Sequence, residues 1–227
     1  GGREHGLKAD QLPGYRSIED PDARAHVAQV WGIDPHELPG KGVSAYELFG
    51  KILDGDIKAM MILGSNPVVS SPNNARVAEA LAKLDLLVVV DLFETETAAY
   101  ADWLLPGTSF LEVEGTMTNL EGRVFYRPRV FEPAGAAMPD AWLLCALAER
   151  LGRGRYFSYS SMSEVFDELC RASAGGKADY SGISYSRLQE AQGLFWPCPG
   201  PGQPGQAHPG TPPALVRGRR LPPCRRP

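Results

Sequence analysis

Two apolar runs separated by an amphipathic stretch constrain the fold of this 227-residue chain more than any other feature. The first run covers residues 57–63 and ends at Gly64-Ser65-Asn66-Pro67, and the second covers residues 86–90 and ends at Asp91. Apolar residues recur at helical spacing between them, which predicts a helix with Ser71-Pro72 as its N-cap and first residue. A strand, a helix and a strand form a βαβ unit with a right-handed connection, so the two strands are expected to lie parallel.

The ends of these two strands are expected to meet at one sheet edge, which is where open α/β sheets bind ligands. Gly64 allows close approach of the backbone, and Ser65 and Asn66 offer a hydroxyl and an amide. A carboxylate such as Asp91 accepts two parallel N–H bonds from a planar group like guanine, or bonds from ribose hydroxyls. A nucleotide-bearing cofactor is the first hypothesis. The alternative is that Asn66-Pro67 is only a turn and that Asp91 caps a short helix over residues 95–100.

The composition places the chain among globular proteins. A hydrophobic content of 43% is enough for one α/β domain with attached segments. No apolar run approaches the roughly 20 residues that cross a bilayer, and no signal peptide opens the sequence. We therefore expect a cytoplasmic protein without membrane contact. Because the chain starts directly in GGREHG, we also expect it to be part of a longer protein.

The cysteines and histidines predict no metal centre within this chain. The cysteines lie far apart and no CxxC pair or Cys-His cluster occurs: Cys145, Cys170, Cys198 and Cys224. Cys145 and Cys170 fall on apolar helix faces and are expected to be buried and reduced.

The C-terminal part has a different composition from the rest. No acidic residue follows Glu190, five arginines lie from Arg217 onward, and ten of the 20 prolines lie from Pro197 onward. Such a tail cannot build a core and is expected to be disordered. The net charge of −4 and the lack of aromatic residues among the arginines argue against nucleic-acid binding. An abrupt switch to Pro, Arg and Gly is typical of a shifted reading frame, which is our hypothesis for this tail.

Several further elements follow from local patterns. Residues 1–16 are expected to be a loop in which Arg3 either binds an anion or is a surface arginine. Helices are predicted over residues 21–31, from a Ser44–Glu47 capping box to Gly55, and from a Ser161–Glu164 box to residue 174.

Between these helices the pattern predicts a third buried strand over residues 103–105 and a polar loop over residues 114–123. A helix should then run from Asp140, as its N-cap, to about residue 151. No catalytic triad or phosphate-binding loop is present, so the residues alone indicate a nucleotide-binding α/β module and no reaction.

Taken together, six motifs in order resemble one family. They are GGREHGLKADQLPGYR, LGSNPVVS, VVVDLFETETAAYADWLLP, EGTMTNLEGRV, GRGRYFSY, and ADYSGISYSRLQ followed by GLFWPCP. The chain is similar to the oxidoreductases that carry bis-molybdopterin guanine dinucleotide with molybdenum, and within them to the assimilatory nitrate reductase branch.

The resemblance implies roles for seven residues. It implies that the strand ends bind one guanine dinucleotide, which assigns cofactor contacts to Gly64, Ser65, Asn66, Val90 and Asp91. Asp140, in the D-x-W pattern, resembles a further cofactor contact. Arg3 resembles an arginine near the molybdenum pocket, where nitrate would approach as substrate.

The resemblance also implies an organisation for the whole enzyme. Residues 1–56 would lead in from a preceding cofactor domain, 57–199 would form a parallel-sheet, Rossmann-like α/β domain that binds the dinucleotide, and 200–227 would be the tail. A 4Fe-4S cluster would lie in a missing N-terminal part. Electrons would come from a donor subunit or a ferredoxin- or NADH-linked reductase, for nitrate assimilation. The alternatives are a formate dehydrogenase-like enzyme and a non-catalytic cofactor-binding remnant.

Overall fold

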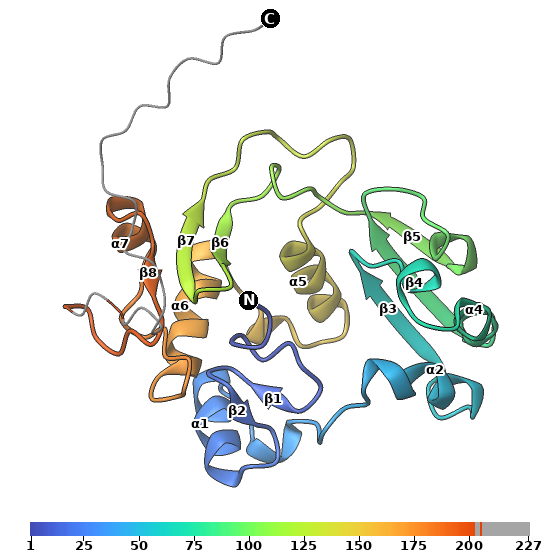
Figure 1. Ribbon diagram of the computed structural model, residues 1–227, viewed down its shortest axis with the longest axis horizontal. Coiled ribbons are helices and arrows are strands. Elements are labelled where there is room, and N and C mark those ends of the chain that lie inside the picture. The colour runs from blue at the N-terminus through green and yellow to red at the C-terminus, as the bar shows by residue number, and fades with distance from the viewer. Residues whose placement is uncertain (203–204, 206–227) are drawn as a thin grey trace, which may run out of the picture.

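The computed structural model describes residues 1–202 and 205, so the prediction of a disordered or frame-shifted tail falls almost wholly outside the described residues. The chain forms a mixed α/β structure with one parallel sheet, one antiparallel sheet and a two-stranded hairpin (Figure 1). Helix α5 (Asp140–Arg150) lies between the two larger sheets. Among the described residues, no helix has the length and apolar character needed to cross a membrane.

The predicted βαβ unit is confirmed. Strands β3 (Ala59–Leu63), β4 (Leu86–Asp91) and β5 (Trp103–Pro106) pair in parallel in the order β3-β4-β5. Between β3 and β4 the chain forms two helices, α3 (Pro67–Ser70) and α4 (Asn74–Leu81). The prediction of Ser71 as N-cap is wrong, because the chain turns again after α3 and Asn73 caps α4 from a left-handed conformation (φ 56°).

The two faces of the parallel sheet are covered differently. One face packs its buried side chains against α4 and α2 (Ala45–Leu53), which forms a core of Phe49, Ile52, Ile62, Val77, Ala80, Leu81, Leu87 and Val89. The opposite face meets α5 across a groove of about 300 Å³. Trp103 borders this groove and is 64% exposed, so the prediction that residues 103–105 form a buried strand is right about the strand and wrong about its burial.

The segment predicted as a polar loop folds instead as a β-hairpin. Strands β6 (Gly115–Thr118) and β7 (Arg123–Arg127) pair antiparallel, and β8 (Leu194–Phe195) joins the other side of β7. Helices α6 (Met162–Ser173) and α7 (Tyr185–Glu190) accompany this sheet. Its core is centred on Tyr180, which is fully buried and packs edge-to-face on Phe166.

The N-terminal segment is attached to α6. Residues 1–16 were predicted as a loop, but they contain β1 (Gln11–Leu12), which pairs with β2 (Arg16–Ser17). The Arg16 guanidinium donates hydrogen bonds to the carbonyl oxygens of Ala172 and Ala174 at the end of α6. A segment far from α6 in the sequence therefore satisfies the free carbonyls of that helix.

Most predicted helix boundaries are confirmed. Helix α1 (Pro21–Trp31) ends at Gly32 in the left-handed region, and Ser44 and Ser161 cap α2 and α6. Short 3₁₀ helices occur at η1 (Pro35–Glu37), η2 (Ala98–Tyr100) and η3 (Gly154–Tyr156). Of the predicted buried thiols, Cys170 is buried, with a pKa raised to about 12 by burial, whereas Cys145 is half-buried.

Candidate functional site

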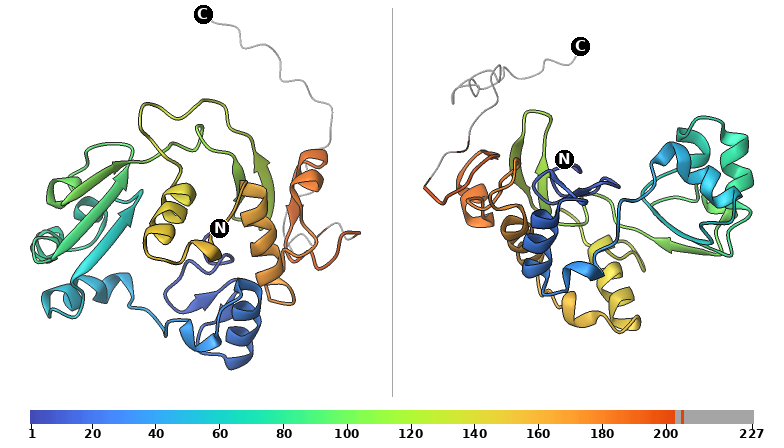
Figure 2. Two further views of the ribbon diagram at one scale, coloured as in Figure 1. Left: turned by 180° about the vertical axis from the view of Figure 1, so that it is seen from behind. Right: turned by 90° about the horizontal axis from the view of Figure 1, so that it is seen from below.

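The three parallel strands end at one edge, as the sequence predicts. The arrowheads of β3 and β4 point toward the middle of the molecule, on the side where α5 lies (Figures 1 and 2). Backbone hydrogen bonds continue the ladder past the strand ends: Gly64 N–H donates to Val90 O at 2.8 Å, and Gly107 N–H donates to Asp91 O at 3.0 Å. The residues that follow β3 and β4 are thereby held side by side.

At the end of β3 the backbone is open to a ligand. Gly64 has a φ of 56°, in the region that favours glycine, and no atom lies within 4 Å of the position a Cβ would take. Ser65 is exposed, and its hydroxyl has no hydrogen-bond partner among the described residues. This pair offers free backbone surface and one free hydroxyl.

At the end of β4, Asp91 keeps one carboxylate oxygen free. Its Oδ1 accepts hydrogen bonds from Leu92 N–H at 2.7 Å and from Phe93 N–H at 3.5 Å, while Oδ2 has no partner in the described part of the chain. The alternative that Asp91 caps the following helix is wrong, since η2 begins at Ala98 and has Thr97 at its N-cap position. Val90 is 1% exposed, so its side chain belongs to the sheet.

Asn66 has a different role from the other strand-end residues. Its Nδ2 donates to Glu96 Oε2 at 2.7 Å, and its Oδ1 accepts from the Thr97 hydroxyl at 2.7 Å and from Thr97 N–H at 3.3 Å. The bond to Asn66 is the first cause that lowers the pKa of the Glu96 carboxyl. The sequence patterns assign no role to Glu96 or Thr97. The available signal is the cluster of two carboxylates and two hydroxyls over residues 94–97, three to six residues beyond the last residue of β4.

Asp140 reaches the same edge by a different route. Met138 N–H donates to Pro106 O at 3.2 Å, and Met138 forms a parallel bridge with Gly107, so Asp140 lies two residues beyond the extended sheet. The prediction that Asp140 is an N-cap is wrong: Pro139 has that position, and no side-chain cap bond forms. Asp140 is the first residue of α5, and partial desolvation raises the pKa of its carboxyl.

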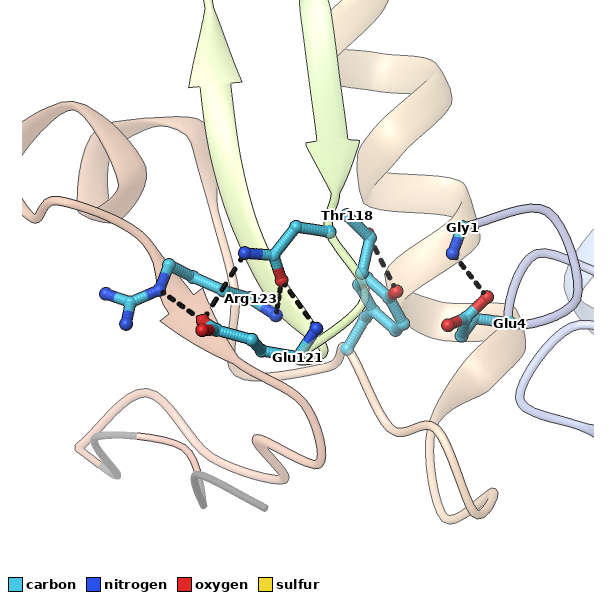
Figure 3. Close-up of polar contacts among 7 residues, drawn as sticks. Gly1, Glu4, Thr118, Glu121 and Arg123 are labelled. Carbon is cyan, nitrogen blue, oxygen red and sulfur yellow. Dashed lines mark hydrogen bonds and ion pairs between the residues drawn. The ribbon is translucent and has the colours of Figure 1, made fainter. Parts of the chain in front are cut away.

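Arg3 lies elsewhere. It is exposed, and its guanidinium forms no hydrogen bond or ion pair with any described residue. The Gly1 amino group lies 2.9 Å from Glu4 Oε2. Figure 3 shows Gly1 and Glu4 beside the tip of the β6–β7 hairpin, where Thr118 is hydrogen-bonded to Tyr180. The structure therefore brings Asp140 to the sheet edge, whereas the N-terminal segment that carries Arg3 begins beside the hairpin.

The described residues include no group of three or more His, Cys, Asp or Glu side chains that could hold a metal ion. The sheet edge instead presents free hydrogen-bonding groups around open backbone, which suits an organic ligand with planar and hydroxyl groups.

Comparison with known proteins identifies the family. A sequence model of the molybdopterin oxidoreductases matches residues 21–150, which include the whole parallel sheet and α5. The chain belongs to the molybdopterin oxidoreductase family. It is 58% identical over 205 residues to the assimilatory nitrate reductase catalytic subunit of Bacillus subtilis, and 40% identical over 200 residues to a nitrate reductase of Synechocystis. These matches cover 90% and 87% of the chain.

More distant members carry other names. The F420-dependent formate dehydrogenase subunit alpha of Methanocaldococcus jannaschii is 36% identical over 198 residues. Among solved structures, acetylene hydratase from Pelobacter acetylenicus superposes with a TM-score of 0.55 over 74% of this chain at 23% identity, which supports the fold. The chain spans 29% of the Bacillus subtilis subunit and 24% of the acetylene hydratase chain.

Proposed function

We propose that this chain contributes to a molybdenum enzyme that reduces nitrate to nitrite, and that its parallel-sheet edge binds one molybdopterin guanine dinucleotide. The observation that carries the substrate assignment is the 58% identity to the assimilatory nitrate reductase catalytic subunit over nearly the whole chain. Under this proposal residues 57–199 belong to a Rossmann-like dinucleotide domain, and residues 1–56 lead in from a preceding cofactor domain. The proposed setting is the cytoplasm, with a 4Fe-4S cluster and the electron donor outside this chain.

The free groups of the sheet edge fit the guanosine part of such a cofactor. Asp91 Oδ2 can accept one N–H group on the edge of guanine, and a second N–H group would take the place of the 3.5 Å bond from Phe93 N–H to Oδ1. The open backbone at Gly64 and the hydroxyl of Ser65 can approach the ribose and phosphates. Asp140 would add a contact from the start of α5.

The molybdenum, when bound through its pterins, supplies the two-electron chemistry of nitrate reduction. The chain itself would bind and orient the dinucleotide, and Arg3 would offer a rigid fork of N–H donors to the nitrate anion. Because Arg3 is exposed and unpaired in the described structure, its guanidinium is available for that contact.

Formate oxidation is the second candidate, since relatives named formate dehydrogenases match at 34–36% identity. A chimeric enzyme can distinguish nitrate reduction from formate oxidation. This chain would replace the matching 205 residues of the Bacillus subtilis subunit, and nitrite formation and formate oxidation would be measured with artificial electron carriers alongside molybdenum content. We expect nitrite formation only. A chimera that contains molybdenum but forms no nitrite would contradict the nitrate assignment.

The guanine assignment has its own test in the same chimera. Asp91→Asn keeps the shape of the side chain but exchanges one acceptor oxygen for a donor, so we expect cofactor occupancy to fall while the fold is retained. Ser71→Ala is the matched control, because Ser71 lies between α3 and α4 and is not one of the residues proposed to contact the cofactor. Full guanine dinucleotide content in the Asp91→Asn protein would refute the role of Asp91.

A further inference from the structure

The hydrogen bonds around Asn66 join the two loops that follow β3 and β4. Asn66 occupies the N-cap position of α3, yet its side chain forms no cap bond to that helix. Its amide turns instead to the neighbouring loop, where Glu96 accepts from Nδ2 and Thr97 donates to Oδ1. Both polar ends of the Asn66 side chain thus already have partners.

Thr97 takes over the capping role that Asn66 leaves vacant. Its Oγ1 accepts a hydrogen bond from Val68 N–H at 3.3 Å, and Val68 is the second residue of α3. One hydroxyl therefore caps the helix after β3 and at the same time holds the side chain of Asn66. Thr97 is fully buried, whereas Asn66 and Val68 are half-buried.

We infer that Asn66, Glu96 and Thr97 form a clamp that joins the loops following β3 and β4 beyond the backbone ladder, and that Thr97 is a positioning residue for the dinucleotide site. This inference rests on the proposed function. It changes the part assigned to Asn66, which acts by joining two loops and not by contacting the cofactor. The groups left for the guanosine are then those of Ser65 and Asp91.

The clamp is held at two ends that differ in exposure. Glu96 is exposed and Thr97 is buried. Loss of the Thr97 hydroxyl would remove a partner from both Val68 N–H and the Asn66 carbonyl, which are half-buried, whereas loss of the Glu96 carboxylate would free one donor that water can reach. Thr97 should therefore matter more than Glu96 for the geometry of the edge.

The test uses the full chain with GDP as the probe, because GDP carries the guanosine and phosphates of the proposed cofactor. Binding would be measured by titration calorimetry for wild type, Thr97→Val and Thr97→Ser, together with urea unfolding of each. Thr97→Val keeps the shape and removes the hydroxyl, and Thr97→Ser retains it. We expect Thr97→Val to weaken GDP binding by about tenfold, which corresponds to roughly 1.4 kcal/mol, and Thr97→Ser to restore it.

Glu96, the exposed residue of the clamp, can be replaced without disturbing the buried core. Glu96→Ala should weaken GDP binding by a smaller factor, and Glu96→Gln, which retains an oxygen acceptor, should bind like wild type. If the Thr97→Val protein is less stable but binds GDP as tightly as wild type, the positioning role of Thr97 is wrong. The proposed nucleotide site is not affected by that result. Failure of the wild-type chain to bind GDP would overturn the nucleotide site and the clamp together.

Discussion

The parallel sheet takes its three strands from one continuous stretch, residues 59–106, whereas the antiparallel sheet joins the neighbouring strands β6 and β7 to the distant β8. Their cores differ in the same way. The core of the parallel sheet comes from residues 49–89, while that of the antiparallel sheet draws on residues 124–198, and the two share no member. Local apolar patterns are therefore enough to predict the first, and the second depends on contacts between segments that are far apart in the sequence.

The largest expected effect tests whether the two cores are independent. Tyr180→Ala removes a fully buried ring that packs on Phe166 and His5 and whose hydroxyl bonds to Thr118. We expect a loss of about 3–5 kcal/mol in the free energy of unfolding of the antiparallel region. Urea unfolding combined with hydrogen exchange by mass spectrometry would show increased exchange over β6–β8 and unchanged exchange over β3–β5.

The control for this change is Tyr46→Ala, since Tyr46 is 86% exposed and should alter stability by less than about 0.5 kcal/mol. Equal increases in exchange over both sheets in the Tyr180→Ala protein would break the comparison, because they would mean that the two cores unfold as one unit.

The reciprocal change lies in the central strand of the parallel sheet. Val89 is a residue of β4 and is fully buried in the core that the covering helices form with the sheet. Val89→Ala should therefore lower the free energy of unfolding by about 1.5–3 kcal/mol. Exchange should rise over β3–β5 and remain unchanged over β6–β8. The exposed Val69 provides the control, since Val69→Ala removes the same atoms from a residue that is 62% exposed. A similar cost for both would show that β4 does not anchor this core.

A smaller effect distinguishes the two candidate caps of α4. Asn73 Oδ1 accepts from Arg76 N–H at 3.3 Å, so Asn73→Ala should cost about 1 kcal/mol. Ser71→Ala should change the free energy of unfolding by less than about 0.5 kcal/mol, because Ser71 follows α3 and caps neither helix from its side chain. The reverse ranking in thermal or urea unfolding would restore the cap that the sequence pattern favoured.

The smallest effect concerns pH and the antiparallel region. Burial lowers the pKa of His5 from its ordinary value of 6.5, against the opposing influence of Glu4. Near and below pH 6.5 the unfolded chain then binds more protons than the folded chain, so stability should fall as the pH falls through this range. His5→Gln removes the titrating group. We expect the stability difference between pH 7.5 and 5.5 to be smaller in His5→Gln than in wild type, and an unchanged difference would exclude His5 as its source.

In the candidate site, as in the fold, some features can be predicted from local sequence and others depend on contacts between distant segments. Gly64, Ser65 and Asp91 could be placed at one edge from the sequence, because they lie at or within two residues of the ends of β3 and β4. The role of Asn66 could not be predicted, since it depends on Glu96 and Thr97, which lie 30 and 31 residues further along the chain. Asp140 shows the same limit: its approach to the edge follows from the pairing of Met138 with the end of β5.

By itself the sequence determined the parallel order of β3 and β4, the capped helices α1, α2 and α6, and the polar character of the strand ends. These features arise from hydrophobic periodicity and helix capping, which are interactions between residues only a few positions apart in the sequence. The tertiary structure alone decided the hairpin at residues 115–127, the exposure of Trp103, the attachment of Arg16 to α6 and the clamp at Asn66. Arg16 and Asn66 find their hydrogen-bond partners in distant segments, and β8 joins the hairpin from far along the chain. Trp103 is exposed because it borders the groove between the sheet and α5. Only the folded chain decides these features.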